Sequence, residues 1–224
     1  MLSIEDNQIR LAEQEWLENW KRGPARLRWT KLPLQVGDAA PDIELMDLSG
    51  GKLHLSSFWS SGPAVIIFLR HFGCSCAFDR AKRLKDECAA YLEAGANVIA
   101  IGQGEPERSK RFAEQRGLPC GLLCDPERRA YEAYNLLEGR PSQVVYGLPD
   151  AFLRHELEAG AQLQQSRHGT ERAAVDSPWQ LPGDFVVGQD GFLRLTYRAQ
   201  FCDDYADPQF LLAAIREAVL GLKH

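Results

Sequence analysis

Short apolar runs alternate with amphipathic segments in the middle of the chain. Three of these runs have the continuous apolar character that is typical of strands covered by helices on both faces. They are residues 64–69, 98–101 and 121–124. Helical periodicity separates them, first between Gly73 and Gly95 and then over residues 106–116. This β-α-β-α-β alternation predicts parallel strands joined by right-handed crossovers.

The helix predicted after Gly73 is amphipathic, with apolar positions on one face and charged positions on the other. The apolar face consists of Phe78, Ala81, Leu84, Cys88 and Leu92, and the charged face of Asp79, Arg80, Lys82, Arg83 and Asp86. Cys88 is therefore expected to be a small core residue, and so is Cys124 at the end of an apolar strand.

Turn-forming residues indicate antiparallel strands on either side of this unit. Residues 43–47 and 52–55 flank a turn that contains Gly50 and Gly51, and residues 184–188 and 192–197 flank Asp190 and Gly191. A last amphipathic helix follows Pro208, with an apolar stripe made of Phe210, Leu211, Ala214, Ile215, Ala218, Val219 and Leu222. Together these elements predict one α/β domain with a central mixed sheet and helices on both faces.

Two further segments lie outside this pattern. Residues 3–22 read as a helix in which Ala12, Trp16 and Trp20 recur on one face, and we expect this face to pack on the domain; the alternative is an arm that grips a second subunit of a homodimer. After a helix over 127–135, residues 136–180 are a long polar stretch with a helix expected near 150–163. The predicted organisation is a helical extension over 1–35 and one domain over 36–224, with an insertion at about 136–180.

Composition excludes several classes of function. The 224 residues carry a net charge of −5 without a cluster of lysines and arginines, which argues against binding to nucleic acids or anionic membranes. The sequence contains neither an apolar run of about 18 residues nor the pattern of a secretion signal, so a cytoplasmic protein is expected. In that reducing compartment the six cysteines are expected to be thiols, of which one or two are reactive.

Cys74 is the candidate nucleophile because it follows a buried strand and a glycine and precedes the first turn of a helix. The unpaired N–H groups at a helix start stabilise a thiolate, and nearby cations can lower a cysteine pKa from about 8.5 to between about 3.5 and 7.5. Arg70, His71 and Arg80 are candidate sources of positive charge. The alternative for the arginines is an ordinary solvated face, and for His71 a structural hydrogen bond.

Cys76 is the nearest thiol to Cys74 and the candidate resolving residue once Cys74 has been oxidised. A Cys-x-Cys disulfide closes a small, strained ring, which suits a catalytic bond that is readily reduced. The alternative is that Cys76 packs in the helix and never pairs. Cys120 and Cys202 lie in less regular segments and are more distant candidates for the same role.

Several motifs together resemble the peroxiredoxin-like members of the thioredoxin superfamily, near the alkyl hydroperoxide reductase and thiol-specific antioxidant group. The motifs are 36–42 (VGDAAPD), 53–58, 68–74 (FLRHFGC), 123–126 (LCDP) with Tyr131 and Tyr134, and 181–187 (LPGDFVV) with Asp190 and Gly191. The resemblance implies a thioredoxin-like fold and a cis Pro182 that faces Cys74. It also implies antioxidant activity. His71 stands where peroxiredoxins have threonine or serine, and their arginine before the late strand is missing.

The leading hypothesis is a thiol oxidoreductase without an organic cofactor or metal, in which Cys74 attacks a peroxide or a disulfide and Cys76 resolves the product. An external thiol system such as thioredoxin or glutathione restores the pair. One alternative is a soft-metal protein that holds Cu(I) or Zn(II) through Cys74, Cys76 and His71. The other is a non-catalytic interaction module that uses Trp16, Trp20 and the 136–180 insertion as contact surfaces.

Overall fold

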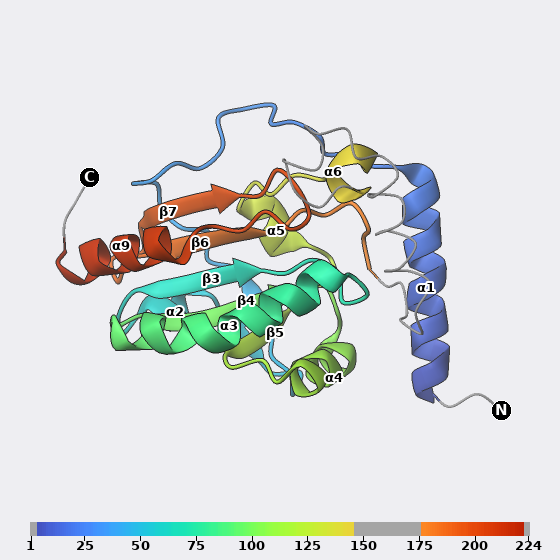
Figure 1. The fold of residues 1–224 in the computed structure, drawn as a ribbon, viewed down its shortest axis with the longest axis horizontal. Helices are drawn as coiled ribbons and strands as arrows, with labels where there is room; N and C mark the ends of the chain where they lie inside the picture. Colours follow the sequence, from blue (N-terminus) through green and yellow to red (C-terminus); the bar gives the residue numbers. More distant parts are fainter. Residues whose placement is uncertain (1–3, 146–175, 222–224) are drawn as a thin grey trace.

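The computed structural model describes residues 4–145 and 176–221, and in this part of the chain the strands form one seven-stranded sheet (Figure 1). The strands are β1 (Glu44–Met46), β2 (Lys52–His54), β3 (Ala64–Phe68), β4 (Asn97–Gly102), β5 (Gly121–Cys124), β6 (Gly183–Val187) and β7 (Leu193–Arg198). Their order is β2-β1-β5-β4-β3-β6-β7. The three central strands β3, β4 and β5 are parallel, whereas β1, β2, β6 and β7 join by antiparallel pairing. The predicted mixed α/β sheet is confirmed.

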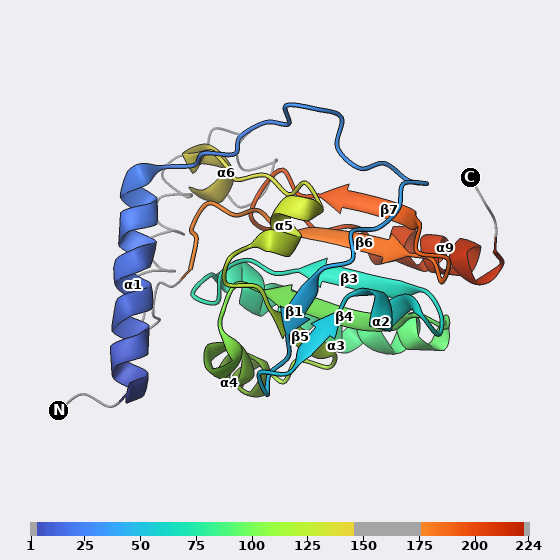
Figure 2. The same ribbon diagram turned by 180° about the vertical axis from the view of Figure 1, so that it is seen from behind.

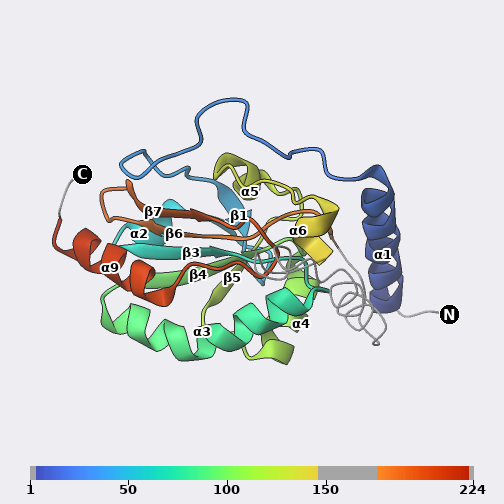
Figure 3. The ribbon, with the colours of Figure 1, turned by 45° about the horizontal axis from the view of Figure 1, so that its top comes forward.

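Helices cover both faces of the sheet, as the apolar runs predicted (Figure 2). The helices are α1 (Ile4–Arg22), α2 (Ser56–Trp59), α3 (Ser75–Glu93), α4 (Pro106–Arg116), α5 (Arg129–Ala133), α6 (Pro141–Val145) and α9 (Pro208–Val219). Helices α3, α4 and α9 lie over one face and α2 and α5 over the other, and Figure 3 shows α9 beside α3. Alternate residues of β3 enter the two cores: Val65 and Ile67 on the α3 side, Ile66 and Phe68 on the α5 side. The site described below lies where β3 leads into α3.

The buried face of α3 differs from the predicted one. The residues that face the sheet are Ala77, Ala81, Leu84, Cys88 and Tyr91. Because this stripe contains Tyr91, the adjacent Leu92 is turned outward and is 55% exposed. Arg80, predicted on the charged face, is fully buried instead.

The other helices also differ in detail from those predicted from the sequence. In α9 the predicted stripe includes Phe210 and Val219, yet both are exposed, because Leu211, Ala214, Ile215 and Ala218 suffice to cover the sheet. Helix α5 begins later than predicted, where the Asp125 carboxylate accepts hydrogen bonds from the first N–H groups. The short helices α2 and α6 were not predicted, because a single turn shows no periodicity.

Helix α1 stands at one end of the sheet and contacts the domain through stacked indole rings (Figure 1). The Trp20 ring stacks on Trp16 at 5.5 Å and on Trp179 at 4.4 Å, and the Trp179 Nε1–H donates to the Asn19 carbonyl. The predicted face of the helix therefore does pack on the rest of the chain. The boundaries of extension, domain and insertion stay predictions, and the helix predicted near 150–163 lies outside the described residues.

Within the described ranges, none of the helices combines the length and the apolar character needed to cross a membrane.

Candidate active site

Cys74 lies at the N-cap of α3, as the sequence predicted. Its backbone is extended, and its carbonyl accepts the first hydrogen bond of the helix, from the Ala77 N–H. Its Sγ accepts a hydrogen bond from the Cys76 N–H at 3.4 Å. A sulfur in this position receives the N–H groups that have no partner within the helix, and these groups favour the thiolate.

Three cysteines form one buried cluster at this helix start, namely Cys74, Cys76 and Cys202. Cys74 is 8% exposed, and the other two are essentially inaccessible to solvent. The Sγ atoms of Cys76 and Cys202 are 3.2 Å apart although 126 positions separate the two residues in the chain. All six cysteines are thiols in this structure. The sulfur of Cys74 is thus surrounded by polar groups and by other sulfurs rather than by hydrocarbon alone.

The three thiols differ in acidity. The pKa of Cys74 is held well below its usual value by its hydrogen bonds with Cys202 and Cys76, and further by the charges of Arg70 and His71, against the effect of burial. The hydrogen bond with Cys202, followed by that with Cys74, raises the pKa of Cys76, and the hydrogen bond with Cys74 raises the pKa of Cys202 to about 12. Of the three sulfurs, that of Cys74 is therefore the most readily ionised.

Arg70 is buried beneath the cluster and is not a solvated residue; it is 1% exposed. Its guanidinium donates to the carbonyl oxygens of Gln180 and Pro178, the latter at 2.8 Å, which orients it between the end of β3 and the segment that leads into β6. The negative charge of Cys74 in turn raises the pKa of Arg70 against the cost of burial. Arg70 therefore supplies a permanent positive charge at the sulfur.

His71 is also buried, in the loop between β3 and Cys74. Its carbonyl accepts a hydrogen bond from the Cys74 N–H at 2.9 Å, and its ring lies 6.4 Å from the Trp16 ring of α1. It thus links the loop before Cys74 to the N-terminal helix, as well as contributing to the lowered pKa of Cys74.

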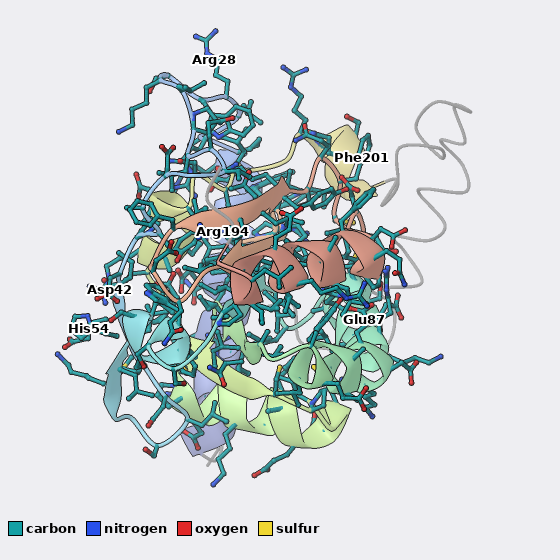
Figure 4. The ribbon with its side chains drawn as sticks, turned by 90° about the vertical axis from the view of Figure 1, so that its left-hand side faces the viewer. Arg28, Asp42, His54, Glu87, Arg194 and Phe201 are labelled. Atoms are coloured by element: carbon teal, nitrogen blue, oxygen red, sulfur yellow. The ribbon has the colours of Figure 1, made fainter. Side chains whose placement is uncertain are left out.

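Cys202 was only a distant candidate in the sequence, and the structure brings it into the cluster. Its N–H donates to the Gln143 carbonyl and its thiol to the Val144 carbonyl at 3.3 Å, both in α6. Figure 4 shows the preceding residue, Phe201, beside α6. The strand topology could have indicated this position of Cys202. Strand β7 is antiparallel to β6, and β6 is antiparallel to β3, so β7 and β3 finish at the same end of the sheet.

Arg80 does not supply charge to Cys74. Its guanidinium forms ion pairs with Glu87 at 2.6 Å and with Asp184 at 3.3 Å, all buried or nearly so, and Figure 4 shows Glu87 on α3. The Asp184 carboxylate also accepts a hydrogen bond from the Ala206 N–H. Arg80 therefore ties α3 to β6 and to the segment after Cys202, and its role is structural.

Pro182 precedes β6 as expected, but its peptide bond is trans, since the described residues contain no cis peptide bond. The expectation of a cis proline was wrong. In the trans form the Pro182 carbonyl accepts a hydrogen bond from the Ala199 N–H at 3.2 Å, which extends the pairing of β6 and β7 by one residue.

The remaining cysteines lie away from the cluster. Cys88 and Cys124 are buried core residues, as predicted, and Cys120 is half-buried beside the core on the α3 side of the sheet. In the part of the chain that the structure covers, His, Cys, Asp and Glu side chains form no group of three or more arranged to hold a metal ion.

Comparisons with known proteins identify a family for this chain. The model of the AhpC/TSA family matches residues 36–196. Peroxiredoxin Bcp of Escherichia coli is 30% identical over 104 residues, which are 46% of this chain and 66% of that protein. Thiol-disulfide oxidoreductase ResA of Geobacillus kaustophilus is 32% identical over 109 residues, 47% of this chain and 60% of that protein. The matched segments thus span less than two thirds of these relatives.

Solved structures share the fold. Peroxidoxin BcpB of Mycobacterium tuberculosis superposes with a TM-score of 0.58 at 20% identity, covering 82% of this chain and 97% of that one. A peroxiredoxin-like protein of Aquifex aeolicus also gives 0.58, at 14% identity, covering 86% and 92%. The thioredoxin-like fold expected from the motifs is confirmed.

Proposed function

The chain belongs to the AhpC/TSA family, and on that premise we propose that it is a thiol-dependent oxidoreductase in which Cys74 reduces a peroxide. The observation that carries the proposal is the position of the Cys74 sulfur, at the start of α3 beside the buried guanidinium of Arg70, with its pKa lowered by its neighbours. A sulfur held as a thiolate near neutral pH is the nucleophile that such chemistry needs.

In the proposed reaction the Cys74 thiolate attacks one peroxide oxygen, the O–O bond breaks, and the leaving alkoxide takes a proton to become an alcohol. Cys74 is left as a sulfenic acid. Arg70 is proposed to stabilise the negative charge that spreads over the sulfur and the two oxygens, since its position is fixed by the carbonyls of Pro178 and Gln180. His71 and Pro182 are proposed to position the loops on either side.

Cys76 is proposed as the resolving thiol, and an external reductant such as thioredoxin or glutathione as the source of electrons. The Cys76 N–H already contacts the Cys74 sulfur. The proposed chemistry uses no organic cofactor. The cytoplasmic location and the homodimer remain predictions from the sequence.

Thiol–disulfide exchange is the second candidate, favoured by the similarity to ResA. In that reaction the same Cys74 thiolate attacks a disulfide sulfur instead of a peroxide oxygen. The non-catalytic interaction module would predict that Cys74 is inert toward both.

The two reactions are separated by a single-turnover experiment. Fully reduced protein is mixed with one equivalent of hydrogen peroxide or of a small aromatic disulfide, and the loss of each oxidant is followed in wild type, Cys74→Ser and Cys124→Ser. We expect wild type and Cys124→Ser to consume peroxide faster than the disulfide, and Cys74→Ser to consume neither. Wild type that leaves both oxidants unconsumed would contradict the proposed function.

A further inference from the structure

A reaction between Cys74 and Cys76 alone makes no use of the close contact between Cys76 and Cys202. The two sulfurs are 3.2 Å apart, about 1.2 Å more than a covalent S–S bond of about 2.0 Å. By contrast, a bond between Cys74 and Cys76 spans a single intervening residue. Resting on the proposed function, we propose that oxidation is passed from Cys74 through Cys76 to Cys202, so that a Cys76–Cys202 disulfide is the stable oxidised form.

The segment that carries Cys202 is held against the start of α3 by independent contacts. The Tyr205 hydroxyl donates to the Cys76 carbonyl at 2.7 Å, and the Ala206 N–H donates to the Asp184 carboxylate at 3.1 Å. On its other side Cys202 donates to the carbonyl of Val144. The segment is therefore fixed to both α3 and α6, and the approach of the two sulfurs follows from these anchors.

The transfer consists of three balanced steps. The Cys74 thiolate first attacks one peroxide oxygen, the O–O bond breaks and Cys74 becomes a sulfenic acid, while the leaving oxygen takes up one proton and departs as an alcohol or, from hydrogen peroxide, as water. The Cys76 sulfur then attacks the Cys74 sulfur, the S–O bond breaks, and hydroxide leaves as water with the thiol proton of Cys76. Finally the Cys202 sulfur attacks the Cys76 sulfur, the Cys74–Cys76 bond breaks, Cys74 leaves as a thiolate, and the Cys202 proton goes to solvent.

The direction of the last step follows from ring size and from the leaving group. The Cys74–Cys76 ring is small and strained, whereas the Cys76–Cys202 bond joins two segments that are already in contact. The acidic thiol of Cys74 is the better leaving group, and its stabilised reduced form makes any disulfide of Cys74 a strong oxidant toward the other two thiols. Transfer to Cys202 therefore returns Cys74 to its reactive state.

The test maps disulfides in the full-length protein. Reduced wild type receives one equivalent of hydrogen peroxide, is quenched at successive times in acid, alkylated, digested without reductant and analysed by mass spectrometry. We expect an early Cys74–Cys76 bond that decays as a Cys76–Cys202 bond appears with Cys74 alkylated. In Cys202→Ser the early bond should persist, and in Cys74→Ser the Cys76–Cys202 bond should be lost. Cys124→Ser, another buried cysteine variant, should behave as wild type.

The outcomes separate the transfer from the proposed function. Consumption of peroxide by wild type with only a Cys74–Cys76 bond at late times would overturn the transfer and leave the function intact. A Cys76–Cys202 bond that forms in Cys74→Ser at the wild-type rate would also overturn it, because the pair would then be oxidised directly. Peroxide left unconsumed by wild type would reject the function itself. The wild-type map alone decides the matter if Cys202→Ser does not fold, which circular dichroism of the reduced variant would show.

Discussion

Cys74 and Cys124 are both buried, yet their acidities move in opposite directions. Cys124 ends β5, where its thiol faces the Asp47 carbonyl at 3.8 Å and burial raises its pKa. Cys74 begins α3, where hydrogen bonds with Cys202 and Cys76 and the charge of Arg70 outweigh burial and lower its pKa. The exposed fraction of a cysteine therefore does not by itself decide its acidity in this fold. The groups aimed at the sulfur decide it.

The largest difference between the two is expected in reactivity toward the oxidant. Cys74→Ser should reduce peroxide consumption to the uncatalysed rate, because serine is not ionised at neutral pH. Cys124→Ser should leave the stoichiometry and the rate unchanged. Stopped-flow measurement of the peroxide with both variants checks this. An equal loss of peroxide consumption in the two variants would show that Cys74 is not the specific reactive cysteine.

The second difference concerns the source of the charge at Cys74. Replacing Arg70 by methionine removes the guanidinium, so the pKa of Cys74 should rise and the midpoint of its alkylation rate against pH should move to higher pH. The change also leaves the carbonyls of Pro178 and Gln180 without their donor, at a cost of about 3 kcal/mol in the free energy of unfolding.

The matched control for Arg70→Met is Arg194→Met. Arg194 is another buried arginine, on β7, and pairs with Asp190 at 2.7 Å away from the cysteine cluster (Figure 4). The Arg194→Met substitution should lower the free energy of unfolding and leave the alkylation of Cys74 unchanged. A midpoint of the Cys74 alkylation profile that stays at the wild-type pH in Arg70→Met would remove Arg70 from the proposed site.

The third difference lies in the pH dependence of alkylation. For Cys124 the alkylation rate should rise about tenfold per pH unit between pH 6 and 8, since its thiolate fraction grows in that range, whereas for Cys74 the rise should level off at a lower pH because its pKa is lowered. Because the folded-state pKa of Cys74 lies below its unfolded value, its thiolate also stabilises the fold above the unfolded pKa. That stabilisation is lost as the pH falls through the lowered pKa. Iodoacetamide labelling followed by peptide mass spectrometry measures both profiles, and parallel slopes would contradict the lowered pKa.

The smallest effect is expected from Tyr205→Phe, which removes the hydrogen bond from the Tyr205 hydroxyl to the Cys76 carbonyl. The loss should lower the free energy of unfolding by about 1 kcal/mol and slow the appearance of the Cys76–Cys202 bond. Tyr134→Phe removes a similar bond, to the Pro41 carbonyl, and should affect stability alone. Urea unfolding and the disulfide map measure the two effects. Equal rates of bond formation in the two variants would show that this anchor does not position Cys202.

Local patterns of apolar, polar and turn-forming residues determined the parallel centre of the sheet, its antiparallel edges and the place of Cys74 at a helix start. These features depend on neighbours within about one helix turn or one strand, and hydrophobic periodicity reports such neighbours directly. The family motifs added the fold but also the wrong expectation of a cis Pro182, because a local motif does not determine the isomer of the Leu181–Pro182 bond.

Only the tertiary structure decided which thiols meet and which arginines are buried. Cys202 reaches Cys76 across 126 positions of chain, because two antiparallel steps bring the end of β7 beside the end of β3. Arg70 and Arg80 look alike as charged residues near Cys74, yet the carbonyls before β6 bind one and Asp184 and Glu87 bind the other. Such partners come from segments far apart in the chain, and no local pattern records a contact that exists only after the sheet has formed.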